Sequence, residues 1–152
     1  MAMSDRYLIG TAAGIIAAAL KIALNWIFFF FDMTLVTEAH LGAMLVSPDN
    51  VEIPAALFMG AVIHLLLGTV FDVLLMFFLH ASGKDYYWLK GGIYGALLWL
   101  VFFLLIPSLL FSEQTFRNVI TAAVHLITNV VFGFAASFLI VKHSERVENP
   151  TA

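Results

Sequence analysis

The sequence predicts an all-α membrane protein, a bundle of four transmembrane helices that takes up nearly the whole chain. Of its 152 residues, 62% are hydrophobic and 11% are charged, and the mean hydropathy is +1.01. Soluble domains carry about 25% charged residues. A bilayer core about 30 Å thick needs about 20 apolar residues for each helical crossing, and the chain holds four such runs. We therefore expect a single transmembrane domain over residues 1–152.

The apolar runs place the four helices at about 7–31, 54–80, 87–111 and 116–141. Proline at position 54 suits the first turn of a helix, and the aromatic cluster at 86–88 suits the membrane interface, where the third run begins. The outer loop, 32–53, contains TLVTEAHLGAMLV, whose rough helical spacing predicts a short interfacial helix, with a flexible loop as the alternative. The polar tail, 142–152, is expected to be frayed.

The distribution of basic residues predicts that both termini face the cytoplasm. Lysine and arginine are retained on the cytoplasmic side of membranes, and acidic residues contribute little to orientation. One side of the predicted bundle carries Arg6, Lys84, Lys90, Lys142 and Arg146. The opposite side carries Arg117 alone, next to an outer loop that has acidic residues but no lysine or arginine. This topology makes the protein multi-pass.

A weak internal repeat appears when His64 is aligned with His125. The segment AVIHLLLGTVFDVLL then faces AAVHLITNVVFGFAA, with alanine, histidine, leucine, valine and phenylalanine coinciding. Such a match predicts two related helical hairpins arranged as a parallel repeat about an axis along the membrane normal.

Small residues follow a four-residue spacing on all four predicted helices. Small side chains at this interval let helix backbones approach closely in a membrane. The glycines expected to pack helices are Gly10, Gly14, Gly60, Gly68, Gly91, Gly95 and Gly133.

Polar residues near the helix midpoints form the most interesting feature of the sequence. The expected intramembrane layer consists of Lys21, Asn25, His64, Asp72, His125 and Asn129, with Asp72 nearer the cytoplasm. A charge at the bilayer centre costs at least about 2.5 kcal/mol, so Lys21 requires a partner, water or neutralisation. The layer is either an ion or proton path, or a structural network that holds the helices in register.

No cofactor is expected, although a b-type haem held by His64 and His125 is an alternative, because both lie at similar depth. The chain has no cysteine, which excludes thiolate metal sites and iron–sulfur ligation. His40, His80 and His143 fall near the interfaces or in loops, where a solvated ring is expected.

No P-loop or nucleophile elbow occurs, and no basic stripe occurs. These absences argue against an enzyme and against nucleic-acid binding.

The later half of the chain resembles a known group of proteins. The segments GGIYGALLWLVFFLLIP and FRNVITAAVHLITNVVFGFAASF are similar to the YqhR-like group of small bacterial membrane proteins. The resemblance rests on the glycine–tyrosine–glycine start, the mid-helix tryptophan, the late proline and the arginine–asparagine opening. It implies a bacterial inner-membrane location and carries no catalytic signature, so no site residue is transferred.

Two functional hypotheses follow from the sequence. The leading one is a non-enzymatic inner-membrane protein that packs through its small-residue faces, as a homo-oligomer or as an accessory subunit of a membrane complex. The competing one is a small ion, proton or solute transport unit that uses the polar layer.

Overall fold

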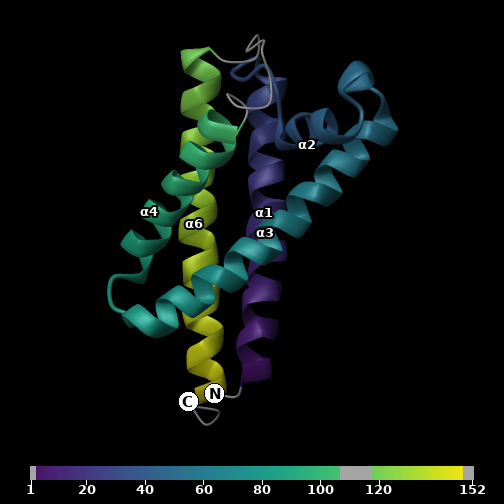
Figure 1. The fold of residues 1–152 in the computed structure, drawn as a ribbon. Coiled ribbons are helices and arrows are strands. Elements are labelled where there is room, and N and C mark those ends of the chain that lie inside the picture. Colours follow the sequence, from purple (N-terminus) through teal and green to yellow (C-terminus); the bar gives the residue numbers. More distant parts are fainter. Residues whose placement is uncertain (1–2, 107–117, 149–152) are drawn as a thin grey trace.

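The computed structural model, which describes residues 3–106 and 118–148, confirms the all-α prediction (Figure 1). Its long helices are α1 (Met3–Phe30), α3 (Pro54–Ser82), α4 (Tyr87–Trp99) and α6 (Val119–Glu148). Helix α4 continues into a π-helical segment, η2 (Leu100–Leu105). Between α1 and α3 lie a short helix, α2 (Glu38–Val46), and a 3₁₀ turn, η1 (Pro48–Asn50). The spans Arg6–Phe30, Pro54–Ser82, Tyr87–Leu105 and Val119–Glu145 are long and apolar enough to cross a membrane.

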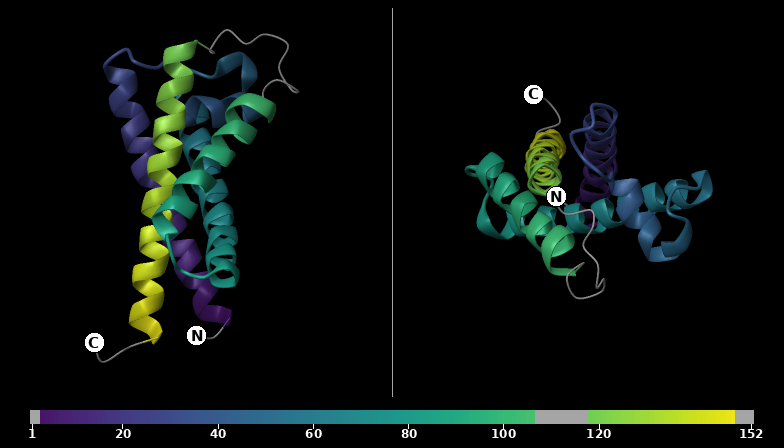
Figure 2. Two further views of the ribbon diagram at one scale, coloured as in Figure 1. Left: turned by 90° about the vertical axis from the view of Figure 1, so that its left-hand side faces the viewer. Right: turned by 90° about the horizontal axis from the view of Figure 1, so that it is seen from above.

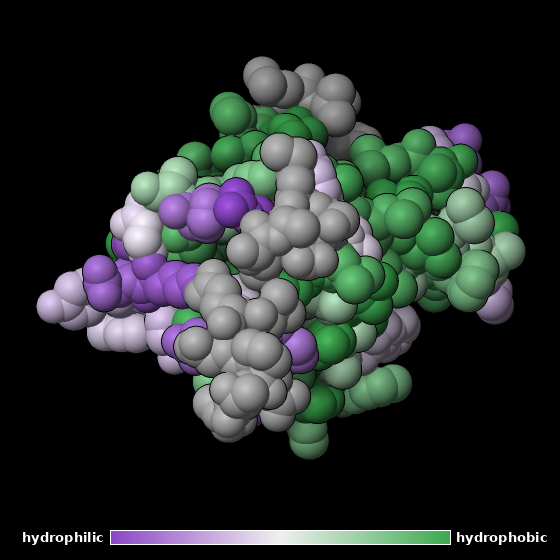
Figure 3. Space-filling view, turned by 90° about the horizontal axis from the view of Figure 1, so that it is seen from below, coloured by the Kyte–Doolittle hydropathy of each residue, from purple (hydrophilic) through white to green (hydrophobic). Residues whose placement is uncertain are grey.

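The chain ascends in α1 and α4 and descends in α3 and α6, so both termini lie at one end of the bundle (Figures 1 and 2). We call this the terminal end, and the opposite one the far end. The common direction of α3 and α6 is the one that the internal repeat predicts. Seen from the terminal end, hydrophilic residues gather beside broad hydrophobic flanks (Figure 3). Large apolar side chains, such as Leu8, Phe58 and Leu66, are exposed, as lipid-facing residues should be.

Glycines hold the helices together in pairs within the single chain. In the first hairpin, a Cβ added at Gly14 would lie 2.7 Å from Thr69 Cα, so α1 and α3 are in backbone contact. In the second hairpin, a Cβ at Gly133 would clash with the carbonyl oxygen of Gly91, and one at Gly95 with that of Asn129. The small-residue faces therefore lie between helices of one protomer.

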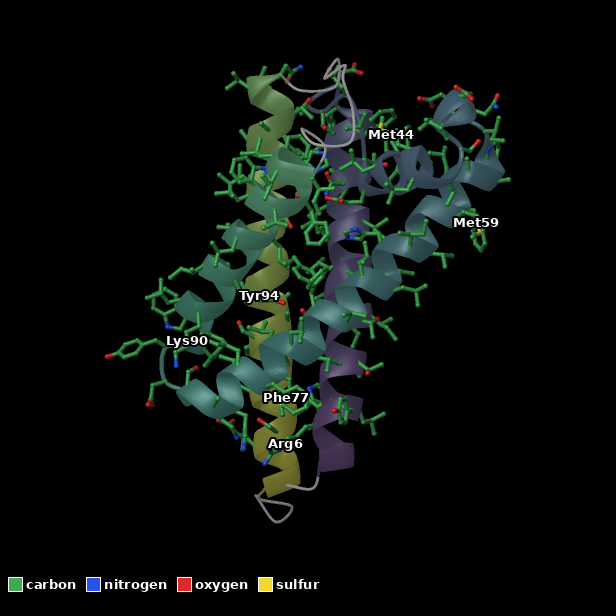
Figure 4. The ribbon with its side chains drawn as sticks, viewed as in Figure 1. Arg6, Met44, Met59, Phe77, Lys90 and Tyr94 are labelled. Carbon is green, nitrogen blue, oxygen red and sulfur yellow. The ribbon has the colours of Figure 1, made fainter. Side chains whose placement is uncertain are left out.

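A tight turn joins α3 to α4 at the terminal end. Lys90, labelled in Figure 4, donates hydrogen bonds from Nζ to the carbonyl oxygens of Ser82 at 3.0 Å and Gly83 at 2.8 Å. A cationic side chain at the last carbonyls of a helix stabilises its C-terminus. From this turn α3 and α4 diverge toward the far end, where α2 packs on α3 (Figure 1).

Some helix boundaries differ from the prediction. Helix α6 continues to Glu148, so the first residues of the expected frayed tail are helical. The third transmembrane helix changes to π-helix at Leu100. Its expected end at 107–111 and the expected start of the fourth helix at 116–117 lie outside the described residues.

The short helix expected in the outer loop exists, but it is packed into the bundle rather than laid on its surface. A Cβ added at Gly42 on α2 would lie 2.7 Å from Gly60 Cα on α3. The prediction of a solvated ring at His40 is wrong, because its side chain is 2% exposed. His40 Nδ1 lies 2.8 Å from Thr37 Oγ1 and completes the cap of α2. His80 and His143 are exposed, as expected.

Candidate functional site

An ion pair between α1 and α2 forms the centre of the candidate site. Lys21 Nζ lies 2.9 Å from Glu38 Oε1, and the two side chains are only 7% and 8% exposed. Glu38 is the first residue of α2, where the helix dipole favours a negative charge. Burial raises the pKa of the Glu38 carboxyl, but the charge of Lys21 and the contacts with His64 and His125 lower this pKa, and the net result is well below its ordinary 4.5. The carboxylate that Lys21 requires is therefore supplied by α2.

Two histidines bind the same carboxylate from opposite hairpins. His125 Nδ1 lies 3.1 Å from Glu38 Oε1, and its Nε2 lies 3.1 Å from the carbonyl oxygen of Val36. His64 Nδ1 lies 3.4 Å from Glu38 Oε2. A carboxylate only accepts hydrogen bonds, so the proton in the His64 contact belongs to Nδ1. The two residues that the internal repeat aligns thus meet at one acidic group.

Amide side chains complete the cluster and tie α1 to α6. Lys21 Nζ donates to Asn129 Oδ1 at 2.9 Å, and Asn25 Nδ2 donates to Thr128 Oγ1 at 3.1 Å. Asn129 in turn donates from Nδ2 to the carbonyl oxygen of His125 at 2.7 Å. We use the term polar cluster for Lys21, Asn25, Glu38, His64, His125, Thr128 and Asn129.

A cavity of about 130 Å³ adjoins the polar cluster. Its lining residues come from α1, α2, α3, α4, η2 and α6. Of these helices, α3 and α4 diverge toward the far end (Figures 1 and 2). Met44 of α2 belongs to its lining, and Tyr94 lies further toward the terminal end, where it reaches α3 (Figure 4). The Tyr94 hydroxyl donates to the carbonyl oxygen of Phe71 at 2.7 Å. The polar lining residues are Lys21, Glu38, His64, His125 and Asn129.

Aromatic rings form much of the remaining wall. Phe71 and Phe102 meet edge to face with their ring centroids 4.9 Å apart. Phe103 stacks on His125 at 4.6 Å and on Trp99 at 6.3 Å. Phe102 and Phe103 belong to the π-helical segment η2, and π-helical turns often occur at functional sites. The π-helix therefore carries two of the rings of the cavity wall.

Two polar atoms of the cavity lining are buried without a hydrogen-bond partner among the described residues. They are Nε2 of His64 and Nε1 of Trp99. Leaving a buried donor or acceptor unpaired costs about 1–3 kcal/mol. Such atoms are expected where a ligand completes the hydrogen bonding.

Asp72 is the one predicted layer residue that stays apart from the polar cluster. It is fully buried, and neither carboxyl oxygen has a hydrogen-bond partner in the described part of the chain. It follows His64 by two helical turns, about 12 Å along α3. At Gly68, between these two residues, an added Cβ would lie 2.6 Å from Ala18 Cβ, so α1 and α3 are tightly packed there.

Sequence reasoning missed Glu38 as a site residue, because an acidic residue in a loop is solvated by default. The available signal was its position directly after Thr37 at the start of a helical pattern, which marks a helix N-terminus. The haem alternative fits poorly, since both nitrogens of His125 face oxygen acceptors and both histidines bind the same carboxylate. His125 has no nitrogen left for iron in this arrangement.

Comparisons of the chain with protein-family models, with curated proteins and with solved structures found no match. The resemblance to the YqhR-like group therefore stays a prediction. The structure itself shows four helices that are long and apolar enough to cross a membrane. It also shows a buried polar cluster beside a cavity.

Proposed function

We propose that this membrane protein binds a small, largely apolar molecule in the cavity beside the polar cluster. The observation that carries the proposal is the lining, in which a few buried polar groups lie against a mostly aromatic and aliphatic wall. Ligand sites in proteins have this composition, because apolar contacts supply affinity and a few polar groups supply orientation. An apolar cavity of about 150 Å³ is large enough to hold benzene, and the cavity found here is about 130 Å³.

This proposal has more support than a protein that acts only by packing against partners. The small-residue faces on which the oligomer hypothesis depends are used inside the protomer, for example where Gly95 meets Asn129. Assembly with itself or with other membrane subunits stays a prediction, because the packing glycines of the described helices already contact other helices of the same chain.

A site of this kind suits a transport protein, since carriers place their substrate site between helices near the middle of the membrane. A proton path from His64 to Asp72 has weaker support, because α1 packs directly on α3 at Gly68. A site for a small molecule requires only the cavity that is present.

The proposal is tested with the protein in lipid nanodiscs and three ring-sized probes, namely toluene, phenol and benzoate. Binding is measured by saturation-transfer NMR. Leu67 lines the cavity, whereas its neighbour Leu66 is 63% exposed. We expect Leu67→Trp to fill the cavity and abolish binding of at least one probe, and the matched control Leu66→Trp to retain it.

Far-UV circular dichroism checks that both variants keep their helices. If every probe gives the same signal with the wild type and with Leu67→Trp, the signal comes from lipid and the proposal is overturned.

A further inference from the structure

The two unpaired polar atoms of the cavity lining have opposite hydrogen-bonding characters. Trp99 Nε1 carries a hydrogen and can only donate. His64 has its Nδ1 proton directed to Glu38, so in the neutral ring Nε2 is an acceptor. Both atoms are buried, and both residues line the same cavity. A ligand that both donates and accepts would therefore satisfy both atoms.

The charged groups of the polar cluster already contact one another, and both nitrogens of His125 already face oxygen acceptors, Glu38 and the Val36 carbonyl. Lys21 and Glu38 neutralise each other at 2.9 Å, and Asn129 accepts a further hydrogen bond from the lysine. A charged ligand would lose its hydration and find no unpaired charge of opposite sign beside it, which is unfavourable in a membrane protein interior. A neutral ligand is favoured.

The wall of the cavity suits a flat ring. Phe71 and Phe102 meet edge to face, and the stacked rings of Trp99 and Phe103 are nearly parallel, with an interplanar angle of 12°. Aromatic rings attract other rings in edge-to-face and offset-stacked arrangements. The volume, about 130 Å³, is that of a single-ring molecule rather than of a fused-ring one.

From these three observations we propose that the ligand is a neutral aromatic ring that bears a hydroxyl group, of the phenol or hydroquinone class. Its hydroxyl hydrogen is donated to His64 Nε2, and a ring oxygen substituent accepts from Trp99 Nε1. The remaining ring packs among Phe71, Phe102 and Phe103. This inference rests on the proposed function, because it names the ligand class of the same cavity.

The test compares four probes in nanodiscs by saturation-transfer NMR, with the cavity-filled Leu67→Trp protein as the blank. Phenol has a donor and an acceptor, anisole only an acceptor, toluene neither, and benzoate a charge. One good hydrogen bond is worth up to about tenfold in affinity. We expect phenol to bind about tenfold more tightly than anisole, anisole to bind more tightly than toluene, and benzoate to bind most weakly.

Two variants locate the polar contacts. His64→Phe and Trp99→Phe each keep a ring and remove the unpaired nitrogen, so each should lower the affinity for phenol relative to that for toluene by about 2–10-fold. The probe comparison in the wild type needs neither His64→Phe nor Trp99→Phe, so it decides the matter even if one of these two proteins does not fold.

The outcomes separate this inference from the proposed function. If toluene and phenol bind equally, or if benzoate binds best, the cavity is a binding site but the ligand class is wrong. If no probe binds above the Leu67→Trp blank, both proposals fail.

Discussion

Removing one partner of the Lys21–Glu38 pair should destabilise the protein far more than removing an exposed acidic group of the same loop. The two side chains are 7% and 8% exposed and 2.9 Å apart, and breaking a buried ion pair by truncating one partner costs about 3–5 kcal/mol. Glu52, which lies 3.4 Å from His40 and is 83% exposed, offers the matched control, since exposed pairs contribute about 0–1 kcal/mol. We therefore expect Glu38→Gln to cost several times more than Glu52→Gln.

The free energy of unfolding is measured by titration with SDS in mixed micelles, with helicity and tryptophan fluorescence as probes. Lys21→Met and the double variant Lys21→Met/Glu38→Gln complete a double-mutant cycle. Because each single variant leaves a buried group without its partner, the double variant should cost less than the sum of the two, by about 0.5–3 kcal/mol. Equal costs for Glu38→Gln and Glu52→Gln, or strict additivity in the cycle, would refute the buried pair.

Three further predictions concern acid sensitivity, the second buried acid and the helix contacts. The pKa of Glu38 is below its ordinary 4.5 in the folded protein, so its stabilisation is complete above pH 4.5 and is lost as pH falls through the lower folded-state value. Thermal unfolding should therefore show the advantage of wild type over Glu38→Gln shrinking only below pH 4.5; an advantage that persists unchanged in strong acid contradicts this. Asp72→Asn should not lower the free energy of unfolding, because that carboxyl has no described partner to lose; a cost like that of Glu38→Gln would reveal one. Gly95→Ala should destabilise by about 1–3 kcal/mol, because the new methyl group meets backbone, whereas Gly92→Ala meets only the half-exposed ring of Phe134 and should cost little; equal melting temperatures for the two variants would contradict the close contact of α4 with α6.

The candidate site was predicted only in part from the sequence. Lys21, Asn25, His64, His125 and Asn129 were all expected in one layer, because residue spacing and helix rise place them at similar depths. The structure brings these five together around a carboxylate that spacing alone does not assign to them. Glu38 lies in a connection, and periodicity says nothing about which way a connection folds.

The sequence by itself determined the four apolar helices and the polar positions on them, because a membrane requires long apolar runs and tolerates few charges within them. Which polar side chains meet was decided only by tertiary structure. Folding α2 against α3 carries Glu38 to Lys21 and the histidines, while tight packing at Gly68 keeps Asp72 apart. The cavity is likewise a product of tertiary structure, since its lining combines residues of all four long helices and of α2 with aromatic rings of the π-helical segment η2.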